Sequence, residues 1–221
     1  MEAPRPVTTV DVVLFTLVDD SLKIGLVRRS KAPHRGRFAL PSGPIRSEDR
    51  DPDAAARRIL EEETGVADGH VEQLYTFGGR ARDPRNWSVT IGYCAVTAAA
   101  RIPASDDLRL VPLKAAKGLP FDHDRIVARA IERLRSRAGY SSLPGFLLPP
   151  HFTIAQLQRV YEIVAGGRLD TASFRRKMWD LRIIKGATAE RPAGAGAGRP
   201  PQYVRLADRV LRTFPRKVGV P

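Results

Sequence analysis

The sequence predicts an α/β (α+β) domain with a mixed sheet and flanking helices, followed by a small winged helix-turn-helix domain. Three observations predict it. Runs rich in β-branched residues fill the first half and are interrupted by an acidic helix; a proline-rich segment follows; two short capped helices then flank a glycine turn. We place the domains at residues 1–146 and 147–221.

The first domain is expected to open with a β-hairpin. Val7–Val18 is rich in β-branched residues, and Leu22–Arg28 follows after the turn-forming residues 19–21. Further strands are expected at Phe38–Leu40, Val71–Gly78 and Trp87–Val96. Helices are expected at Pro52–Thr64, capped by Asp51 or Asp53 and stopped by Gly65, and at Asp122–Arg137. Gly139–Pro150 is expected to be a linker.

The second domain is expected to begin with a helix over Phe152–Ala165. Thr153 is a good N-cap, and Gln156 three residues later completes a capping box. After a Gly-Gly turn, Asp170 can cap a second helix over Thr171–Leu181. The strand-like runs Ile183–Lys185 and Gln202–Leu206 around a Gly/Ala tract then predict a wing.

Composition excludes several classes of protein. Hydrophobic residues make up 43% of the 221 residues, which is enough for a core, and no apolar run approaches the length of a membrane span. The only cysteine, Cys94, excludes a disulfide framework and is expected to be a buried, inert thiol. The first residues lack the apolar stretch of a signal peptide, so we expect a cytoplasmic protein.

The net charge of +13 is concentrated at one end of the chain. Residues 1–150 hold 23 Lys and Arg against 19 Asp and Glu, whereas residues 151–221 hold 14 against 5. A local basic excess of this kind points to a polyanionic partner. The alternative is an arginine-rich surface that reflects a GC-biased genome.

Leu40–Gly43 and Arg58–Val66 resemble the Nudix box, a motif whose helix places three glutamates on one face to hold Mg²⁺ against a diphosphate. Here Ile59 takes the place of the first glutamate, Arg50 stands where an acid is expected, and Gly43 is one residue too far upstream. The resemblance implies a pocket that binds a nucleoside diphosphate derivative without cleaving it. We therefore expect no catalytic residues and no metal ligands, although residues 61–63 could hold one Mg²⁺ weakly.

Three further matches are Tyr75–Gly78 with Arg82–Trp87, Phe121–Asp124, and the run Phe152–Lys177. In this order they are similar to the Nudix-related transcriptional regulators of NAD metabolism, the NrtR family. The resemblance implies a Nudix fold that senses ADP-ribose or a related NAD metabolite. It also implies a winged helix that binds, as a homodimer, the double-stranded operator DNA of NAD biosynthesis or salvage genes. No membrane partner is expected. Ser42 and Pro44 depart from the family's loop, which has a glycine and an aromatic residue there.

The effector site is expected to combine cations for the diphosphate with an aromatic ring for the adenine. Arg82 and Arg85 offer forked donors, unless residues 82–85 are only a surface turn with a local ion pair. Arg58 is expected to pair with an internal acid and support the loop, and His123 to help cap its helix rather than act as a base. The candidate residues are Arg37, Phe38, Gly43, Arg58, Glu62, Glu63, Phe77, Arg82, Arg85 and Trp87, with Phe38, Phe77 or Trp87 stacking on the base.

The DNA-binding candidates lie on the two helices and the wing. Arg and Lys reach guanine edges or phosphates, Ser and Thr hold the backbone, and a mobile basic arm enters a minor groove. The wing could instead be a disordered linker. The candidates are Thr153, Gln156, Thr171, Ser173, Arg175, Arg176, Lys177, Arg191, Arg199 and Tyr203.

Two other functions remain open from the sequence alone. One is an active Nudix pyrophosphatase on ADP-ribose-like substrates, whose basic tail binds RNA or another partner. The other is a Nudix-type regulator that senses a sugar or another metabolite.

Overall fold

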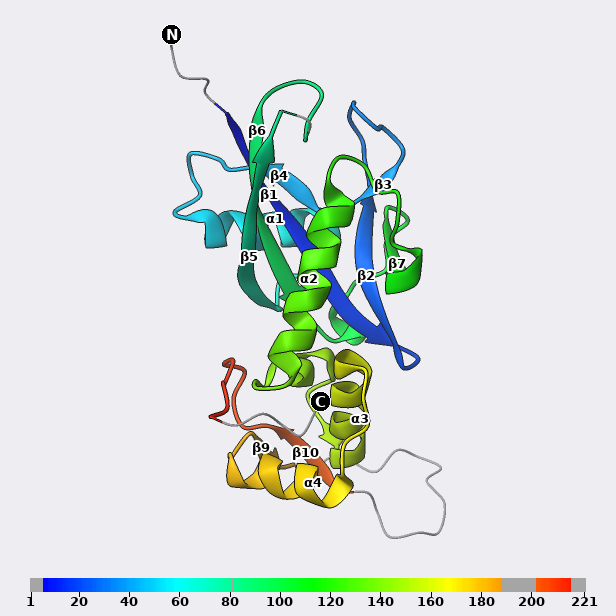
Figure 1. Cartoon of the computed structure of the whole chain (residues 1–221), viewed down its shortest axis with the longest axis vertical. Coiled ribbons are helices and arrows are strands. Elements are labelled where there is room, and N and C mark those ends of the chain that lie inside the picture. Colours follow the sequence, from blue (N-terminus) through cyan, green and yellow to red (C-terminus); the bar gives the residue numbers. More distant parts are fainter. Residues whose placement is uncertain (1–5, 81, 188–201, 216–221) are drawn as a thin grey trace. The chain divides into compact units, whose positions relative to one another are not determined.

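The computed structural model describes residues 6–80, 82–187 and 202–215 (Figure 1). Contacts divide the chain into two compact units, Met1–Arg133 and Leu134–Pro221. The division falls within helix α2 (His123–Ala138), upstream of the boundary expected at 146/147. Residues 139–147 belong to the second unit because they supply part of its apolar core.

The first unit is built on a seven-stranded mixed sheet with the path β3-β2-β1-β6-β5, while β4 pairs with β1 and β7 with β2. The parallel pair β1–β6 joins antiparallel pairs elsewhere in the sheet. The strands are β1 (Val7–Val18), β2 (Ser21–Arg28), β3 (Phe38–Ala39), β4 (Ser42–Pro44), β5 (His70–Gly79), β6 (Ser88–Val96) and β7 (Leu108–Pro112). The expected hairpin is confirmed, whereas β4 and β7 were not predicted. Short 3₁₀ turns lie at η1 (Ala99–Arg101) and η2 (Leu113–Ala115).

Strand β1 is buried on both faces. Val10, Val12 and Leu14 belong to one apolar cluster with Ile59 of helix α1 (Pro52–Thr64). The intervening residues point to the opposite face, where Asp11 approaches His123 at the start of α2. Because helices cover both faces of the sheet (Figure 1), this strand is a continuous apolar run rather than an alternating one.

Helix α1 begins and ends where the sequence predicts. The Asp51 carboxylate accepts a hydrogen bond from the Ala54 N–H at 2.7 Å, and Gly65 closes the helix at φ 72°. A Cβ on Gly65 would lie 2.5 Å from Pro103 Cγ, so both backbone conformation and space require glycine there. The apolar side of the helix includes Ala55, Ile59 and Leu60, which are buried.

The second unit contains a helix-turn-helix and a three-stranded sheet. Helix α3 (Ile154–Ala165) has the predicted capping box, and α4 (Thr171–Asp180) is capped by Asp170. The sheet has the order β8-β10-β9, from β8 (Phe152–Thr153), β10 (Tyr203–Leu206) and β9 (Ile184–Gly186). The strands β9 and β10 are antiparallel, as a wing requires.

The prediction of a linker over Gly139–Pro150 is wrong. A 3₁₀ helix, η3 (Leu143–Leu147), occupies its centre, and Leu143 and Phe146 are only 1% and 3% exposed. The prolines suggested a spacer, but the apolar residues between them pack into the second unit.

Residues beyond the wing also pack onto the second unit. The Phe214 N–H donates to the Tyr140 carbonyl at 2.7 Å, and Ser142 and Arg212 exchange two hydrogen bonds of 2.9 and 3.0 Å. Phe214 is buried. The chain after β10 therefore packs against the segment that precedes η3.

Two further expectations from composition concern the burial of the Cys94 thiol and the lack of a membrane-spanning segment. The expected burial of Cys94 is confirmed, and loss of hydration raises the pKa of its thiol to about 12, which disfavours the reactive thiolate. Within the described ranges, every helix is too short or too polar to span a bilayer.

Replacing Tyr161 by phenylalanine is expected to lower the free energy of unfolding by about 1 kcal/mol. The Tyr161 ring is fully buried, and its hydroxyl donates to the Ser141 carbonyl at 2.8 Å. The variant leaves that buried carbonyl without this donor. Urea unfolding measures the change, and Tyr75→Phe on a 56% exposed residue is the control. Equal effects of the two changes would contradict the assignment.

Candidate functional site

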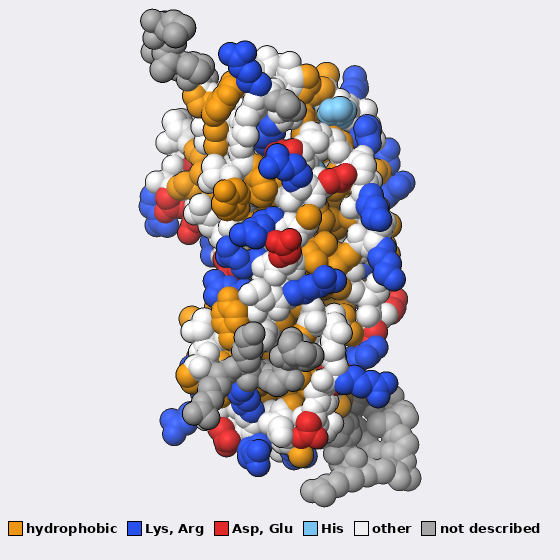
Figure 2. Space-filling view, viewed as in Figure 1, with side chains coloured by type: hydrophobic (Ala, Val, Ile, Leu, Met, Phe, Trp, Pro, Cys, Tyr) orange, Lys and Arg blue, Asp and Glu red, His pale blue; other side chains and the backbone are white. Residues whose placement is uncertain are grey.

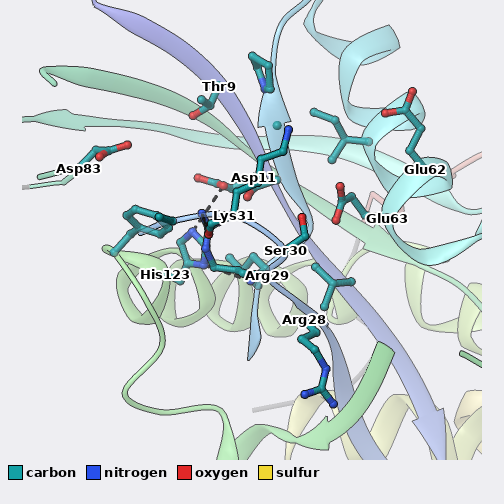
Figure 3. A pocket seen from close by; sticks show the side chains of 18 of the residues that line it. Thr9, Asp11, Arg28, Arg29, Ser30, Lys31, Glu62, Glu63, Asp83 and His123 are labelled. Carbon is teal, nitrogen blue, oxygen red and sulfur yellow. Dashed lines mark hydrogen bonds and ion pairs between the residues drawn. The ribbon is translucent and has the colours of Figure 1, made fainter. Parts of the chain in front are cut away.

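A cavity of about 420 Å³ opens in the first unit (Figure 3). It lies where β1 changes partner, since β4 pairs with Thr9–Asp11 and β2 with Leu14–Val18. The volume falls in the range of small-molecule sites. Six of the sequence-predicted effector residues line it: Gly43, Arg58, Glu62, Glu63, Arg82 and Arg85.

The other four predicted residues lie outside the cavity lining. The guanidinium groups of Arg28 and Arg109 lie 5.0 and 4.2 Å from the centroid of the Phe38 ring. Phe77 is buried in β5, Trp87 precedes β6 and is 38% exposed, and Arg37 donates to the Gly118 carbonyl at 2.6 Å. The structure therefore places none of the three proposed stacking rings in this pocket.

Phe121 is an aromatic residue of the cavity wall that the sequence reasoning did not select. Its backbone has φ 58°, a strained value for a bulky residue. The ring meets the rings of His34 and His123 at centroid distances of 5.0 and 5.4 Å, and the Arg29 guanidinium lies 4.8 Å from its centroid. The motif Phe121–Asp124 was recognised, but nothing in it indicates which side chain turns inward.

Arg82 belongs to a buried ionic cluster on the cavity wall. Its guanidinium pairs with Asp11 on β1 and, at 3.1 Å, with Asp122 beside α2. The Asp11 and Arg82 side chains are 2% and 7% exposed. Arg82 thus joins the loop before β6 to the sheet and to the start of α2. Its backbone lies in a turn, where its N–H donates to the Gly79 carbonyl at 3.4 Å, but its side chain is buried.

His123 does not cap its helix, contrary to the expectation. The Leu40 N–H donates to its Nδ1 at 3.1 Å, and its Nε2 lies 3.6 Å from an Asp11 oxygen. Burial lowers the pKa of His123, and the bond to Nδ1 leaves the proton of the neutral ring on Nε2. The adjacent Asp124 ties the preceding loop to the start of the helix, since it accepts from the N–H groups of Gly118 and Leu119 at 2.9 Å each.

The expectation that Arg58 pairs with an internal acid is confirmed. Its guanidinium makes two hydrogen bonds of 2.6 and 2.8 Å to Asp49 and a third of 3.1 Å to the Pro44 carbonyl. Its bonds lower the pKa of Asp49 to about 2, so this ion pair persists at neutral pH. Arg58 therefore supports the loop between β4 and α1.

The carboxylates of α1 are poorly arranged for a divalent cation. Both oxygens of Glu62 accept from Arg46, at 2.7 and 2.9 Å, and one also accepts from Arg58 at 3.2 Å. Ile59 is 1% exposed and packs in the core, and the Arg50 side chain is 86% exposed and pairs with Asp51. Across the residues that the structure describes, no three His, Cys, Asp or Glu side chains form a metal-binding group.

The two alternatives for residues 82–85, a role in the effector site and a local ion pair, both apply to Arg85. It lines the cavity and also forms a local ion pair with Asp83, at 2.7 Å.

In the second unit, α4 turns Phe174 and Met178 inward. Four of the predicted DNA-binding residues on this helix, Thr171, Ser173, Arg175 and Arg176, are exposed, while Lys177 is half-buried. Arg175 lies 3.4 Å from the Gln202 amide oxygen, just before β10. Figure 2 shows basic side chains spread over the visible face of this unit, with acidic ones among them.

The remaining DNA-binding candidates differ in their local environment. Thr153 and Gln156 form the capping box of α3 through bonds of 2.7 and 3.1 Å. Tyr203 is half-buried on β10 opposite Thr153. Arg191 and Arg199 lie outside the described residues.

Comparison with known proteins identifies both units. The NUDIX domain model matches residues 7–134, and the model of the NrtR DNA-binding winged helix domain matches residues 144–206. The ADPR responsive transcriptional repressor NtrR of Acinetobacter baylyi is 35% identical over 226 residues, which cover 99% of this chain and 89% of that protein.

Two solved structures extend the comparison. Shewanella oneidensis NrtR complexed with a 27mer DNA is 35% identical, with a TM-score of 0.85 over 96% of this chain and 99% of that one. The NUDIX domain of Shewanella oneidensis NrtR complexed with ADP ribose is 37% identical, with a TM-score of 0.55 over 60% of this chain and 90% of that one. The chain belongs to the NrtR family, in which a NUDIX domain precedes a winged helix.

Proposed function

We propose that this chain is a transcriptional repressor that releases operator DNA when its first unit binds ADP-ribose or a closely related NAD metabolite. The observation that carries the proposal is 35% identity to an ADPR responsive repressor across 99% of the chain, with both units included. The family resemblance seen in the sequence extends this proposal to genes of NAD biosynthesis or salvage.

The cavity has the charge that such an effector needs. Seven Lys and Arg side chains line it against four Asp and Glu, so its wall carries an excess of three positive charges. A diphosphate is best held by several fixed cations, and guanidinium groups bind its oxygens in pairs. The pocket chemistry therefore supports a nucleoside diphosphate rather than an uncharged sugar.

The test of this proposal is a DNA-binding assay with the full chain. The protein is expected to retard a fragment of the DNA upstream of its own gene, and ADP-ribose is expected to release it. An equimolar mixture of AMP and ribose 5-phosphate is the control, because it supplies the same groups without the linkage. Complexes that persist at saturating ADP-ribose would rule out the proposed response.

A homodimer is part of the proposal. A two-fold dimer presents two equivalent recognition helices, so the operator is expected to be palindromic. Light scattering on the purified protein, with and without operator DNA, measures the stoichiometry.

We also propose that the pocket binds without hydrolysing, which sets the chain apart from an active Nudix pyrophosphatase. Two observations support this: Ile59 packs in the core, and the Glu62 carboxylate accepts hydrogen bonds from Arg46 and Arg58. With Mg²⁺ and ADP-ribose, AMP release is expected to stay at the level of the buffer. Turnover in the range of about 1–1000 per second, typical of enzymes, would establish the enzyme instead.

A further inference from the structure

The cations that line the cavity differ in whether a carboxylate already neutralises them. Five of the seven form ion pairs: Arg28 with Asp107, Arg46 and Arg58 with Glu62, Arg82 with Asp11, and Arg85 with Asp83. The other two, Arg29 and Lys31, form no ion pair with any residue that the structure describes. They follow β2 directly and lie on the same wall of the pocket (Figure 3).

Arg29 is held in place without being neutralised. Its Nε donates to the Pro33 carbonyl at 2.9 Å, and its Nη2 donates to the Lys31 carbonyl at 3.4 Å. The guanidinium lies 4.8 Å from the centroid of the Phe121 ring. These contacts fix the orientation of the group but supply no full negative charge, so it is preorganised for an anion.

The electrostatics of this wall agree with that geometry. Burial and the nearby Arg85 lower the pKa of Arg29, and the attraction of Asp83, Asp11 and Glu63 offsets only part of that effect. Across the cavity, Glu63 on α1 faces Lys31 (Figure 3), and burial together with Glu62 raises the pKa of the Glu63 carboxyl. An anionic ligand beside Arg29 and Lys31 would relieve the excess of positive charge.

The opposite wall does not fit the Mg²⁺ that a Nudix box implies. The position of the first glutamate is filled by Ile59, which packs in the core. Glu62 is bound by Arg46 and Arg58 at 2.7–3.2 Å, so a metal would have to displace two guanidinium groups. Glu63 is left as a single carboxylate, whereas a tightly bound Mg²⁺ takes several oxygen ligands in octahedral geometry.

We propose that Arg29 and Lys31 bind the diphosphate of the effector and that this binding needs no divalent cation. The inference rests on the proposed function and concerns the same pocket. Here the charge that a metal would supply comes from one guanidinium and one ammonium group on the segment after β2. The response to the effector is then independent of the free Mg²⁺ concentration.

Calorimetry on the full chain tests this proposal with ADP-ribose as the probe, once in EDTA and once in millimolar Mg²⁺. The two dissociation constants are expected to agree within about twofold. Arg29→Met and Lys31→Met are each expected to weaken binding by about tenfold or more, and Arg29→Lys to lose less than Arg29→Met. Arg35→Met is the matched control, because this exposed arginine of the same loop does not line the cavity.

Retention of operator binding by each variant shows that the chain has folded. Binding that appears only with Mg²⁺, or equal affinity of Arg29→Met, Lys31→Met and Arg35→Met, overturns this inference alone. No binding of ADP-ribose by the wild-type chain in either buffer overturns the proposed function, and the inference with it.

Discussion

Replacing Arg82 by alanine is expected to lower the free energy of unfolding by about 3–5 kcal/mol. Arg82 pairs with Asp11 and Asp122, and all three side chains are less than 10% exposed. Removing the cation leaves two buried carboxylates without their partner, and a buried uncompensated charge costs far more than a surface pair contributes. The loop before β6 also loses its attachment to the sheet.

Urea unfolding at neutral pH measures this effect. Arg80→Ala removes an exposed arginine from the same loop and is expected to change stability by less than about 0.5 kcal/mol. An Arg82→Ala variant as stable as Arg80→Ala would contradict the role of the cluster.

This expectation changes how an effector-binding defect at Arg82 is interpreted. The sequence suggests Arg82 as a ligand for the diphosphate, and the residue does line the cavity. Its guanidinium is nevertheless engaged with Asp11 and Asp122. Loss of ADP-ribose binding in Arg82→Ala would therefore be expected from a disrupted wall as well as from a lost contact, so stability must be measured alongside affinity.

Local signals in the sequence were enough to predict the helices and the hairpin. Asp51 and Gly65 mark the two ends of α1, and Thr153 with Gln156 marks the start of α3, because caps depend on hydrogen bonds between residues close in the chain. The short strand β7 carries little periodicity of its own and is defined by pairing with β2, more than 80 residues away in the chain. The buried η3 segment was missed because the prolines of residues 139–150 suggested a spacer despite the apolar residues between them.

The candidate site was only partly predictable for a similar reason. Arg58 and Glu62 were found because the Nudix box fixes their spacing along one helix. Arg29 and Phe121 reach the cavity from segments far apart in the sequence, one after β2 and one before α2, and neither carries a motif that indicates its direction. Phe38, Phe77 and Trp87 were plausible rings by type, but the pleat of a strand and long-range contacts decide which ring faces a pocket.

Helix α4 is where the largest loss of DNA affinity is expected. Arg175 and Arg176 lie on the exposed side of α4, opposite the buried Phe174 and Met178. Each alanine substitution is expected to cost about 1–3 kcal/mol of binding free energy, or roughly 5- to 150-fold in affinity, if the residue reads a base. The fold should tolerate both changes, because alanine favours helix and the buried face is untouched.

Fluorescence anisotropy with operator and scrambled DNA across a range of salt concentrations separates two kinds of contact. A base-reading arginine loses affinity for the operator but little for scrambled DNA, whereas a phosphate contact weakens both and lowers the salt slope by about one. Arg135→Ala removes an equal charge from α2, outside the matched winged helix, and serves as the control. If Arg175→Ala and Arg176→Ala bind the operator as Arg135→Ala does, α4 does not read the DNA, and specificity must come from another part of the chain.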